Sequence, residues 1–322
     1  MSPLVSVCIP VYNAAPFIKA CVDSILAQTF QDFEIVLVND GSTDDSLRVC
    51  RQLAEACPKI TLVSTENQGD TRTRGEAAAH ASGTWVTFVD SDDTLPPTAL
   101  ADLLGGCSEQ TDIVVGCHYE TAEPAHFVDI KKWRETLVRS DVIYCSPVAR
   151  LFRKEVLPKS VFSLKTSVRT GTDMPMNIKI AFQSQKDVFL INKKVYNYYE
   201  HADSLSHSAV WSIQKISDLY EEVVDSVPAE KREAFMPQLI ENRLIALENR
   251  YFADGWKEEP VQGTPYVGQL QQDIRESGYK LTAVQKRCAY RPDSSWTAFR
   301  VKFHHKAVIA KRIIRRKLHL GD

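Results

Sequence analysis

Three aspartates lie within four positions of one another directly after an apolar run, in the stretch TFVDSDDTL at residues 87–95. Asp90, Asp92 and Asp93 would repel one another, and a buried strand end would add the cost of desolvation. A bound cation would offset both costs. Carboxylate oxygens suit Mn²⁺ or Mg²⁺, which bind through one or two carboxylates together with substrate phosphates. The alternative is a strand-to-helix turn in which an aspartate caps the helix and the prolines at 96–97 stiffen the exit.

Two more polar clusters follow apolar runs nearer the N-terminus. Pro10, Tyr12 and Asn13 end the run at 4–11, and Asp40 begins the loop DGSTD after the run at 33–39. Asp40 is either a solvated turn residue or a recognition group that accepts a hydrogen bond from a base or a ribose hydroxyl. The chain has no G-x-x-x-x-G-K-[ST] or G-x-G-x-x-G pattern, which counts against a P-loop NTPase and a dinucleotide enzyme.

Alternating strands and helices must position these clusters. Short β-rich runs predict strands at 4–11, 33–39, 60–64, 85–89 and 112–117. Apolar residues at helical spacing predict helices at 16–28, at 71–82 and from residue 100, and one through 47–53 that Ser42 or Thr43 would cap. This order predicts an α/β fold, with a mostly parallel central sheet and helices on both faces. Since ligands bind beyond the carboxyl ends of parallel strands, the three polar clusters should meet at one edge.

The motifs resemble those of a known family, the family 2 glycosyltransferases with the GT-A fold. In order they are VSVCIPVYNAAPFIKACVDSILAQTFQDFEIVLVNDGSTDDS, ENQGDTRTRG and GTWVTFVDSDD. The resemblance is close over about the first 115 residues and extends more weakly to about residue 210. It implies an inverting enzyme that transfers a sugar from a nucleoside diphosphate donor, often UDP.

The resemblance also implies roles for single residues. Donor-binding residues would be Pro10, Tyr12, Asn13, Asp40, Arg74, Asp90 and Ser91. Pro10 and Tyr12 would line the base pocket, Asp40 would hold the base, Arg74 would lie near the diphosphate or the base, and Asp90 would contact the ribose or the metal. Asp92 would be the principal ligand of Mn²⁺ or Mg²⁺, Asp90 a second ligand, and His201 a further candidate. Asp173, at the start of a predicted helix at 173–182, would be the base that deprotonates the acceptor hydroxyl. The alternative for Asp173 is a helix cap.

A few positions depart from the family pattern. Gly75 stands where Asn is usual, Ala77 where Gly is usual, and Thr172 replaces the usual Glu. Tyr199 stands where Arg is common, in a segment that in this family normally approaches the metal or the diphosphate. Tyr199, His201 and Ser204 are the residues that would take over that role. These departures leave open the alternative that the acceptor-side half of the domain has lost its catalytic function.

The predicted organisation is a GT-A domain at 1–210, with a nucleotide-sugar-binding half at 1–117 and an acceptor-side half at 118–210. A helical C-terminal region follows at 211–322, with helices at 211–224 and 230–251, a linker at 258–266 and a basic amphipathic tail at 294–318. Between residues 286 and 317 the chain has eleven Lys or Arg and one acid, Asp293. The tail is either a surface helix packed on the body or an interfacial helix on an anionic membrane. Its apolar residues are mainly aliphatic, so we expect no nucleic-acid partner.

The composition is that of a globular protein: 322 residues, 44% apolar, 25% charged and a net charge of −2. It predicts no general affinity for polyanions. With no basic, apolar leader and eight cysteines without a C-x-x-C pair, we expect a cytoplasmic protein, peripheral at the inner face of the plasma membrane. The sequence thus indicates a metal-dependent glycosyltransferase acting on a glycan or lipid-linked acceptor in surface polysaccharide synthesis. The alternatives are a non-catalytic nucleotide-sugar-binding or membrane-associated scaffold, and a nucleotidyltransferase, although 10–15 lacks a Gly-rich phosphate loop.

Overall fold

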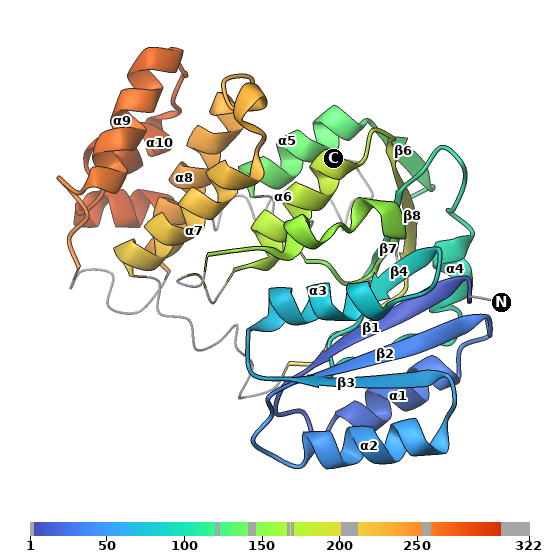
Figure 1. Ribbon diagram of the computed structural model, residues 1–322. Coiled ribbons are helices and arrows are strands. Elements are labelled where there is room, and N and C mark those ends of the chain that lie inside the picture. The colour runs from blue at the N-terminus through green and yellow to red at the C-terminus, as the bar shows by residue number, and fades with distance from the viewer. Residues whose placement is uncertain are drawn as a thin grey trace. The chain divides into compact units, whose positions relative to one another are not determined.

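The computed structural model describes residues 3–119, 121, 123–140, 146–165, 168, 171–200, 212–252 and 259–303 (Figure 1). The chain divides into two compact units. One consists of Met1–Leu137 with Asp141–His207, and the other of Val138–Ser140 with Ser208–Asp322. The predicted assignment of 1–117 and 118–210 to the two substrates, and of 211–322 to a separate region, stays a prediction.

The first unit is built on a mixed sheet, which has eight strands in the described residues, in the order β3-β2-β1-β4-β7-β5-β8-β6. The strands are β1 (Val5–Val11), β2 (Phe33–Asp40), β3 (Ile60–Thr65), β4 (Trp85–Phe88), β5 (Ile113–Cys117), β6 (His126–Val128), β7 (Arg150–Arg153) and β8 (Val188–Lys194). Parallel pairs join β1 to β2 and β4, β2 to β3, and β5 to β8. The mostly parallel α/β fold is confirmed. A short element was expected at 148–157, but its place as the antiparallel strand β7 between β4 and β5 was not predicted.

The helices of this unit are α1 (Ile18–Leu26), α2 (Ser46–Ala56), α3 (Asp70–His80), α4 (Ala99–Leu104), α5 (Ile130–Arg139) and α6 (Asp173–Gln183). Figure 1 shows α1 and α2 on one face of β1–β3 and α3 on the other. The predicted cap of α2 by Ser42 or Thr43 is wrong. The helix begins at Ser46, whose backbone N–H donates to Asp44 Oδ1 at 2.9 Å. Ser42 and Thr43 instead bond to Asn13 in the loop after β1.

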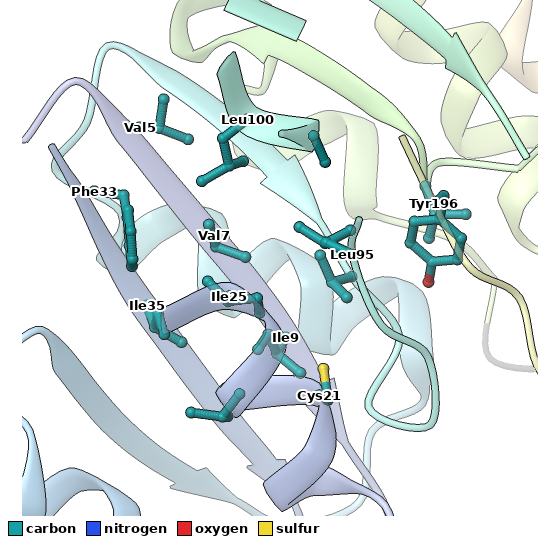
Figure 2. Packing of buried hydrophobic residues seen from close by; sticks show 14 of the residues in the cluster. Val5, Val7, Ile9, Cys21, Ile25, Phe33, Ile35, Leu95, Leu100 and Tyr196 are labelled. Carbon is teal, nitrogen blue, oxygen red and sulfur yellow. The ribbon is translucent and has the colours of Figure 1, made fainter. Parts of the chain in front are cut away.

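The core of the first unit holds the strand ends in place. Every residue of β1 is buried, as expected of a central strand covered on both faces. On one face Val5, Val7 and Ile9 pack with Ile35 of β2 and Ile25 of α1 (Figure 2). In α1 the buried positions recur at helical spacing, which is why that helix lies flat on the sheet. The loops that follow β1, β2 and β4 therefore start from fixed positions.

The second unit is helical. Its helices are α7 (Ile213–Ser226), α8 (Met236–Arg250), α9 (Pro265–Ser277) and α10 (Ala283–Tyr290), and the chain is helical again at 295–303. The predicted linker at 258–266 is wrong at its end. Pro265 is the first residue of α9, where proline is favoured, and Thr264 Oγ1 caps the helix by accepting from Val267 N–H. Sequence reasoning also missed α10, although Thr282 and Gln285 form a capping box. No helix in the described ranges is both long and apolar enough to cross a bilayer.

Candidate active site

The loops after β1 and β2 are tied to each other by side-chain hydrogen bonds. Asn13 Oδ1 accepts from Thr43 N–H at 2.8 Å, and Asn13 N–H donates to Ser42 Oγ at 3.1 Å. Asn13 has a φ of 50°, a conformation that Asn tolerates better than most residues. Two of the three predicted polar clusters therefore meet at the carboxyl edge of the sheet, as the strand order led us to expect.

Pro10 and Tyr12 border the same edge. Pro10 is buried inside β1 opposite Val38, whereas Tyr12, which directly follows the strand, is 48% exposed. An exposed aromatic ring beside a polar loop could stack on a base. Their assignment to a base pocket stays a prediction.

Asp40 is buried and anchors a neighbouring loop. It is 3% exposed; Oδ1 accepts from Gln68 N–H at 2.8 Å and Oδ2 from Gly69 N–H at 3.0 Å. Next to it, Gly41 has a φ of 65°, and a Cβ at this position would lie 2.6 Å from Asn67 N. The loop before α3 can therefore approach β2 this closely only at a glycine. A role for Asp40 in base recognition stays a prediction, beside this structural one.

Arg74 joins two predicted site residues that are far apart in the sequence. Its side chain lies on α3 and is 2% exposed. Nη2 lies 2.6 Å from Asp90 Oδ1, and Nη1 lies 3.2 Å from Asp173 Oδ1 and also pairs with Asp70. The guanidinium thus fixes the carboxylate after β4 relative to the carboxylate that begins α6. Planar forks with several donors are what make arginine suitable for such a buried hub.

The charges of this hub shift one another's pKa values. Burial would lower the pKa of Arg74, but Asp90 and Asp173 outweigh it and hold the pKa above its usual value. Burial raises the pKa of Asp173, and Asp90 adds to the rise, while Arg74 and Arg150 act against it. A carboxylate with a raised pKa is a stronger base once ionised. Asp173 keeps 38% of its side chain exposed, so a substrate can reach it.

The acidic stretch at 90–93 separates into groups with different partners. Asp93 is 1% exposed and points inward: Oδ2 accepts from Tyr196 Oη at 2.7 Å, and Oδ1 from Tyr199 N–H at 2.8 Å. Burial raises the pKa of Asp93 to about 7. Tyr196 Oη also accepts from Asp90 N–H at 3.1 Å. Asp93 therefore fixes the turn to the segment after β8, and the like-charge cost is shared among separate partners rather than left to a cation alone.

Asp92 and Asp90 remain as carboxylates that could hold a cation. Ser91 and Asp92 are partly exposed, and Asp90 keeps 34% of its side chain exposed although Arg74 holds its Oδ1. Within the described ranges no three His, Cys, Asp or Glu side chains are grouped as a metal site. One or two carboxylates fit a Mn²⁺ or Mg²⁺ ion whose other ligands are phosphate and water. His201 and Ser204 lie outside the described residues.

Sequence reasoning missed a pair that holds the first turn of α6. Arg150 on β7 is 3% exposed, and its Nη1 donates to Asn177 Oδ1 at 3.0 Å. Asn177 Nδ2 in turn donates to the backbone carbonyl of Asp173 at 3.0 Å. Arg150 also lies 5.4 Å from the ring centroid of Trp133, which is buried. The available signal was a lone arginine inside the apolar run at 147–152.

Packing accounts for one departure from the family pattern. A Cβ at Gly75 would lie 2.7 Å from Cβ of Phe162, which belongs to a short 3₁₀ turn, η3 (Lys159–Phe162).

At Tyr199 the backbone N–H donates to Asp93, and the phenol oxygen accepts from Thr94 Oγ1 at 3.3 Å. Tyr199 thus supports the turn at 90–93, where we expected a group directed at the donor.

Comparison with known proteins points to one family. Residues 6–159 match the family described as Glycosyl transferase family 2. Glycosyltransferase GlyA of Streptococcus pneumoniae serotype 4 is 29% identical over 264 residues, which cover 74% of this chain and 37% of GlyA. The uncharacterized glycosyltransferase EpsJ of Bacillus subtilis is 29% identical over 221 residues, 64% of either chain. This chain thus spans less than two thirds of the length of both relatives.

Solved structures share its fold at low identity. TarS residues 1–349 from S. aureus, in complex with UDP-GlcNAc, superimposes with a TM-score of 0.69 at 18% identity, over 94% of this chain and 92% of that one. The mannosyltransferase PcManGT from Pyrobaculum calidifontis, in complex with GDP-Man and Mn²⁺, has a TM-score of 0.52 at 19% identity, over 96% and 87%. By their motifs and their family match, residues 6–159 belong to glycosyl transferase family 2, and the chain shares the GT-A fold of TarS.

Proposed function

We propose that the protein transfers a sugar from a nucleoside diphosphate donor, UDP-linked in our expectation, to a hydroxyl of a glycan or lipid-linked acceptor. The observation that carries this proposal is the convergence of Asp90 and Asp173 on Arg74 at the carboxyl edge of the sheet. One carboxylate follows the donor-side strand β4 and the other begins α6. Two acids held apart by a buried arginine suit a reaction in which one binds the donor and the other activates the acceptor.

The donor would lie across the ends of β1, β2 and β4. Pro10 and Tyr12 contact the base, Asn13 and Ser91 border the donor, Asp40 accepts from the base, and Asp90 binds the ribose. TarS binds UDP-GlcNAc and PcManGT binds GDP-Man, which supports a nucleotide-sugar donor of either kind. Asp92, with Asp90 beside it, would hold Mn²⁺ or Mg²⁺. Such an ion supplies charge stabilisation of the diphosphate leaving group.

Asp173 acts as the base in this proposal. Since Arg74 occupies Oδ1, we assign the acceptor proton to Oδ2. The acceptor oxygen attacks the anomeric carbon from the side opposite the phosphate as its O–H proton passes to Asp173. The bond between the anomeric carbon and the phosphate oxygen breaks, and the nucleoside diphosphate leaves with the electron pair. The new glycosidic bond has the inverted configuration.

We further propose that the protein works at the inner face of the plasma membrane and that 294–318 contacts an anionic lipid surface. The support is the excess of basic residues between 286 and 317. A peripheral position would hold the site beside lipid-linked acceptors and would suit surface polysaccharide synthesis.

The test is release of nucleoside diphosphate from a panel of UDP- and GDP-sugars by the full chain, with Mn²⁺ or with EDTA. We expect metal-dependent turnover of one donor class. Asp173→Asn should bind UDP as tightly as the parent protein yet lose turnover by about two to four orders of magnitude. UDP binding without turnover of any donor would favour the scaffold alternative, and near-normal turnover by Asp173→Asn would place the base elsewhere.

A further inference from the structure

The helix at 295–303 carries its large aromatic residues on the outside. Trp296, Phe299 and Phe303 are 52%, 56% and 62% exposed. Their rings form a continuous row, with centroids 5.3 Å apart between Trp296 and Phe299 and 6.3 Å apart between Phe299 and Phe303. We refer to these three residues as the aromatic stripe.

The inner face of the same helix is filled by smaller side chains. Thr297, Ala298 and Val301 are 0%, 5% and 3% exposed, so this face is already packed against the second unit. A soluble helix normally buries its largest apolar residues and exposes polar ones. Each large apolar side chain left in water forgoes the stabilisation that burial would give. Three exposed aromatic side chains in one row indicate a surface that binds an apolar partner.

Basic residues flank the stripe on both sides. At about 100° per residue, the three aromatic side chains fall within an arc of about 60°. Arg300 and Lys302, both exposed, project about 80° to either side of the centre of that arc. Long basic side chains in this position can reach lipid phosphates while the rings enter the boundary between headgroups and acyl chains.

We propose that the aromatic stripe is the surface through which this protein docks on an anionic lipid bilayer. The proposal deepens the membrane contact of the proposed function by naming the residues that enter the lipid. Charge complementarity favours a bilayer over a second copy of the chain, because residues 304–318 add six Lys or Arg and no acid. Nucleic acid is disfavoured because the apolar residues that continue the chain at 304–318 are aliphatic, which suits lipid better than stacked bases.

The experiment is co-sedimentation of the full chain with sucrose-loaded vesicles of phosphatidylcholine alone or with 30% phosphatidylglycerol. We expect binding to the anionic vesicles and at least tenfold weaker binding to the neutral ones. Replacing Trp296, Phe299 and Phe303 together by Ser should weaken anionic binding at least tenfold. Phe127→Ser, which removes a 49% exposed aromatic ring from β6, is the matched control and should bind as the parent does.

A second readout locates the stripe in the bilayer. In a background in which Trp211 and Trp256 are replaced by Phe, brominated lipids should quench the fluorescence on binding, whereas adding Trp296→Phe should keep the affinity and remove most of that quenching. Trp85 and Trp133 are 4% and 2% exposed and should contribute little. Because the stripe is exposed, the triple variant should keep its thermal unfolding midpoint and its UDP binding, so failure of the membrane proposal is distinguishable from failure of the donor site.

Three results would overturn the proposal. Binding of the triple variant to anionic vesicles at parental strength would assign the contact to another part of the chain. Loss of a dimer in the triple variant, with lipid binding unchanged, would make the stripe a self-association surface. If the protein bound a single-stranded oligonucleotide through the aromatic stripe and did not bind lipid, the stripe would be a nucleic-acid site.

Discussion

Arg74 Nη2 lies 2.6 Å from Asp90 Oδ1, so a buried cation on α3 holds the carboxylate that follows β4. The same guanidinium reaches Asp173, 99 residues further along the chain. An arginine can serve two acids in two directions because its donors form a rigid fork, whereas the ammonium of lysine is a single point charge. The geometry of the site therefore requires an arginine at position 74, and not only a positive charge.

Arg74→Lys should therefore weaken both stability and turnover. At least one of its three acidic partners, Asp70, Asp90 and Asp173, would lose its ion pair, at a cost of about 1–3 kcal/mol in the free energy of unfolding. Misplacement of Asp90 relative to Asp173 should reduce turnover roughly a hundredfold. Urea unfolding and donor turnover measure the two effects. Arg72→Lys is the control on the same helix, since Arg72 donates to the carbonyl of Leu164 and should change neither quantity by much. Equal behaviour of the two variants would refute the hub.

Asp92→Asn tests the cation. If Asp92 is the principal protein ligand, the variant should lose most of the dependence of UDP affinity on Mn²⁺ while its affinity in EDTA stays unchanged. Each tenfold loss corresponds to about 1.4 kcal/mol. Isothermal titration of UDP with and without Mn²⁺ measures this. Full retention of the Mn²⁺ effect in Asp92→Asn would remove Asp92 from the proposed metal site.

Tyr196 should be as important for the turn at 90–93 as the aspartates themselves. Its hydroxyl donates to Asp93 Oδ2 and accepts from Asp90 N–H. Tyr196→Phe leaves both groups short of a partner in a buried place, which should cost about 1–3 kcal/mol in the free energy of unfolding. Tyr198→Phe is the matched control, because Tyr198 is 52% exposed. A parental unfolding midpoint for Tyr196→Phe would show that the turn holds without this hydroxyl.

Much of the fold was predictable, because β1 to β4 and the helices between them have clear apolar periodicity and short links. The meeting of the loops at 12–13 and 40–44 followed from the parallel order. The contact of Asp90 with Asp173 through Arg74 depends on how the chain returns through β7 and α6, which local pattern cannot fix. Nor could sequence tell which aspartate of 90–93 turns inward, since Asp92 and Asp93 are chemically identical. The capping signals of α9 and α10 were readable and were missed.

Arg150 should affect the pKa of Asp173 without contacting the substrate. Its positive charge acts to lower the pKa of Asp173, against a rise caused by burial, and through Asn177 it holds the first turn of α6. The base must be ionised to accept a proton, so turnover should fall as pH falls through the pKa of Asp173. Removing the cation in Arg150→Met should raise that pKa and move the acid limb of the pH–rate profile to higher pH.

Asn177→Ala separates the two effects of Arg150, since it removes the hydrogen bond to the Asp173 carbonyl and keeps the charge. It should lower turnover at every pH with little movement of the acid limb, and the Michaelis constant for the donor should stay near that of the parent. A purely structural role for Arg150 would lower activity uniformly in both variants. An acid limb that moves only in Arg150→Met would therefore identify its charge, acting through space on Asp173, as part of how the site sets its basicity.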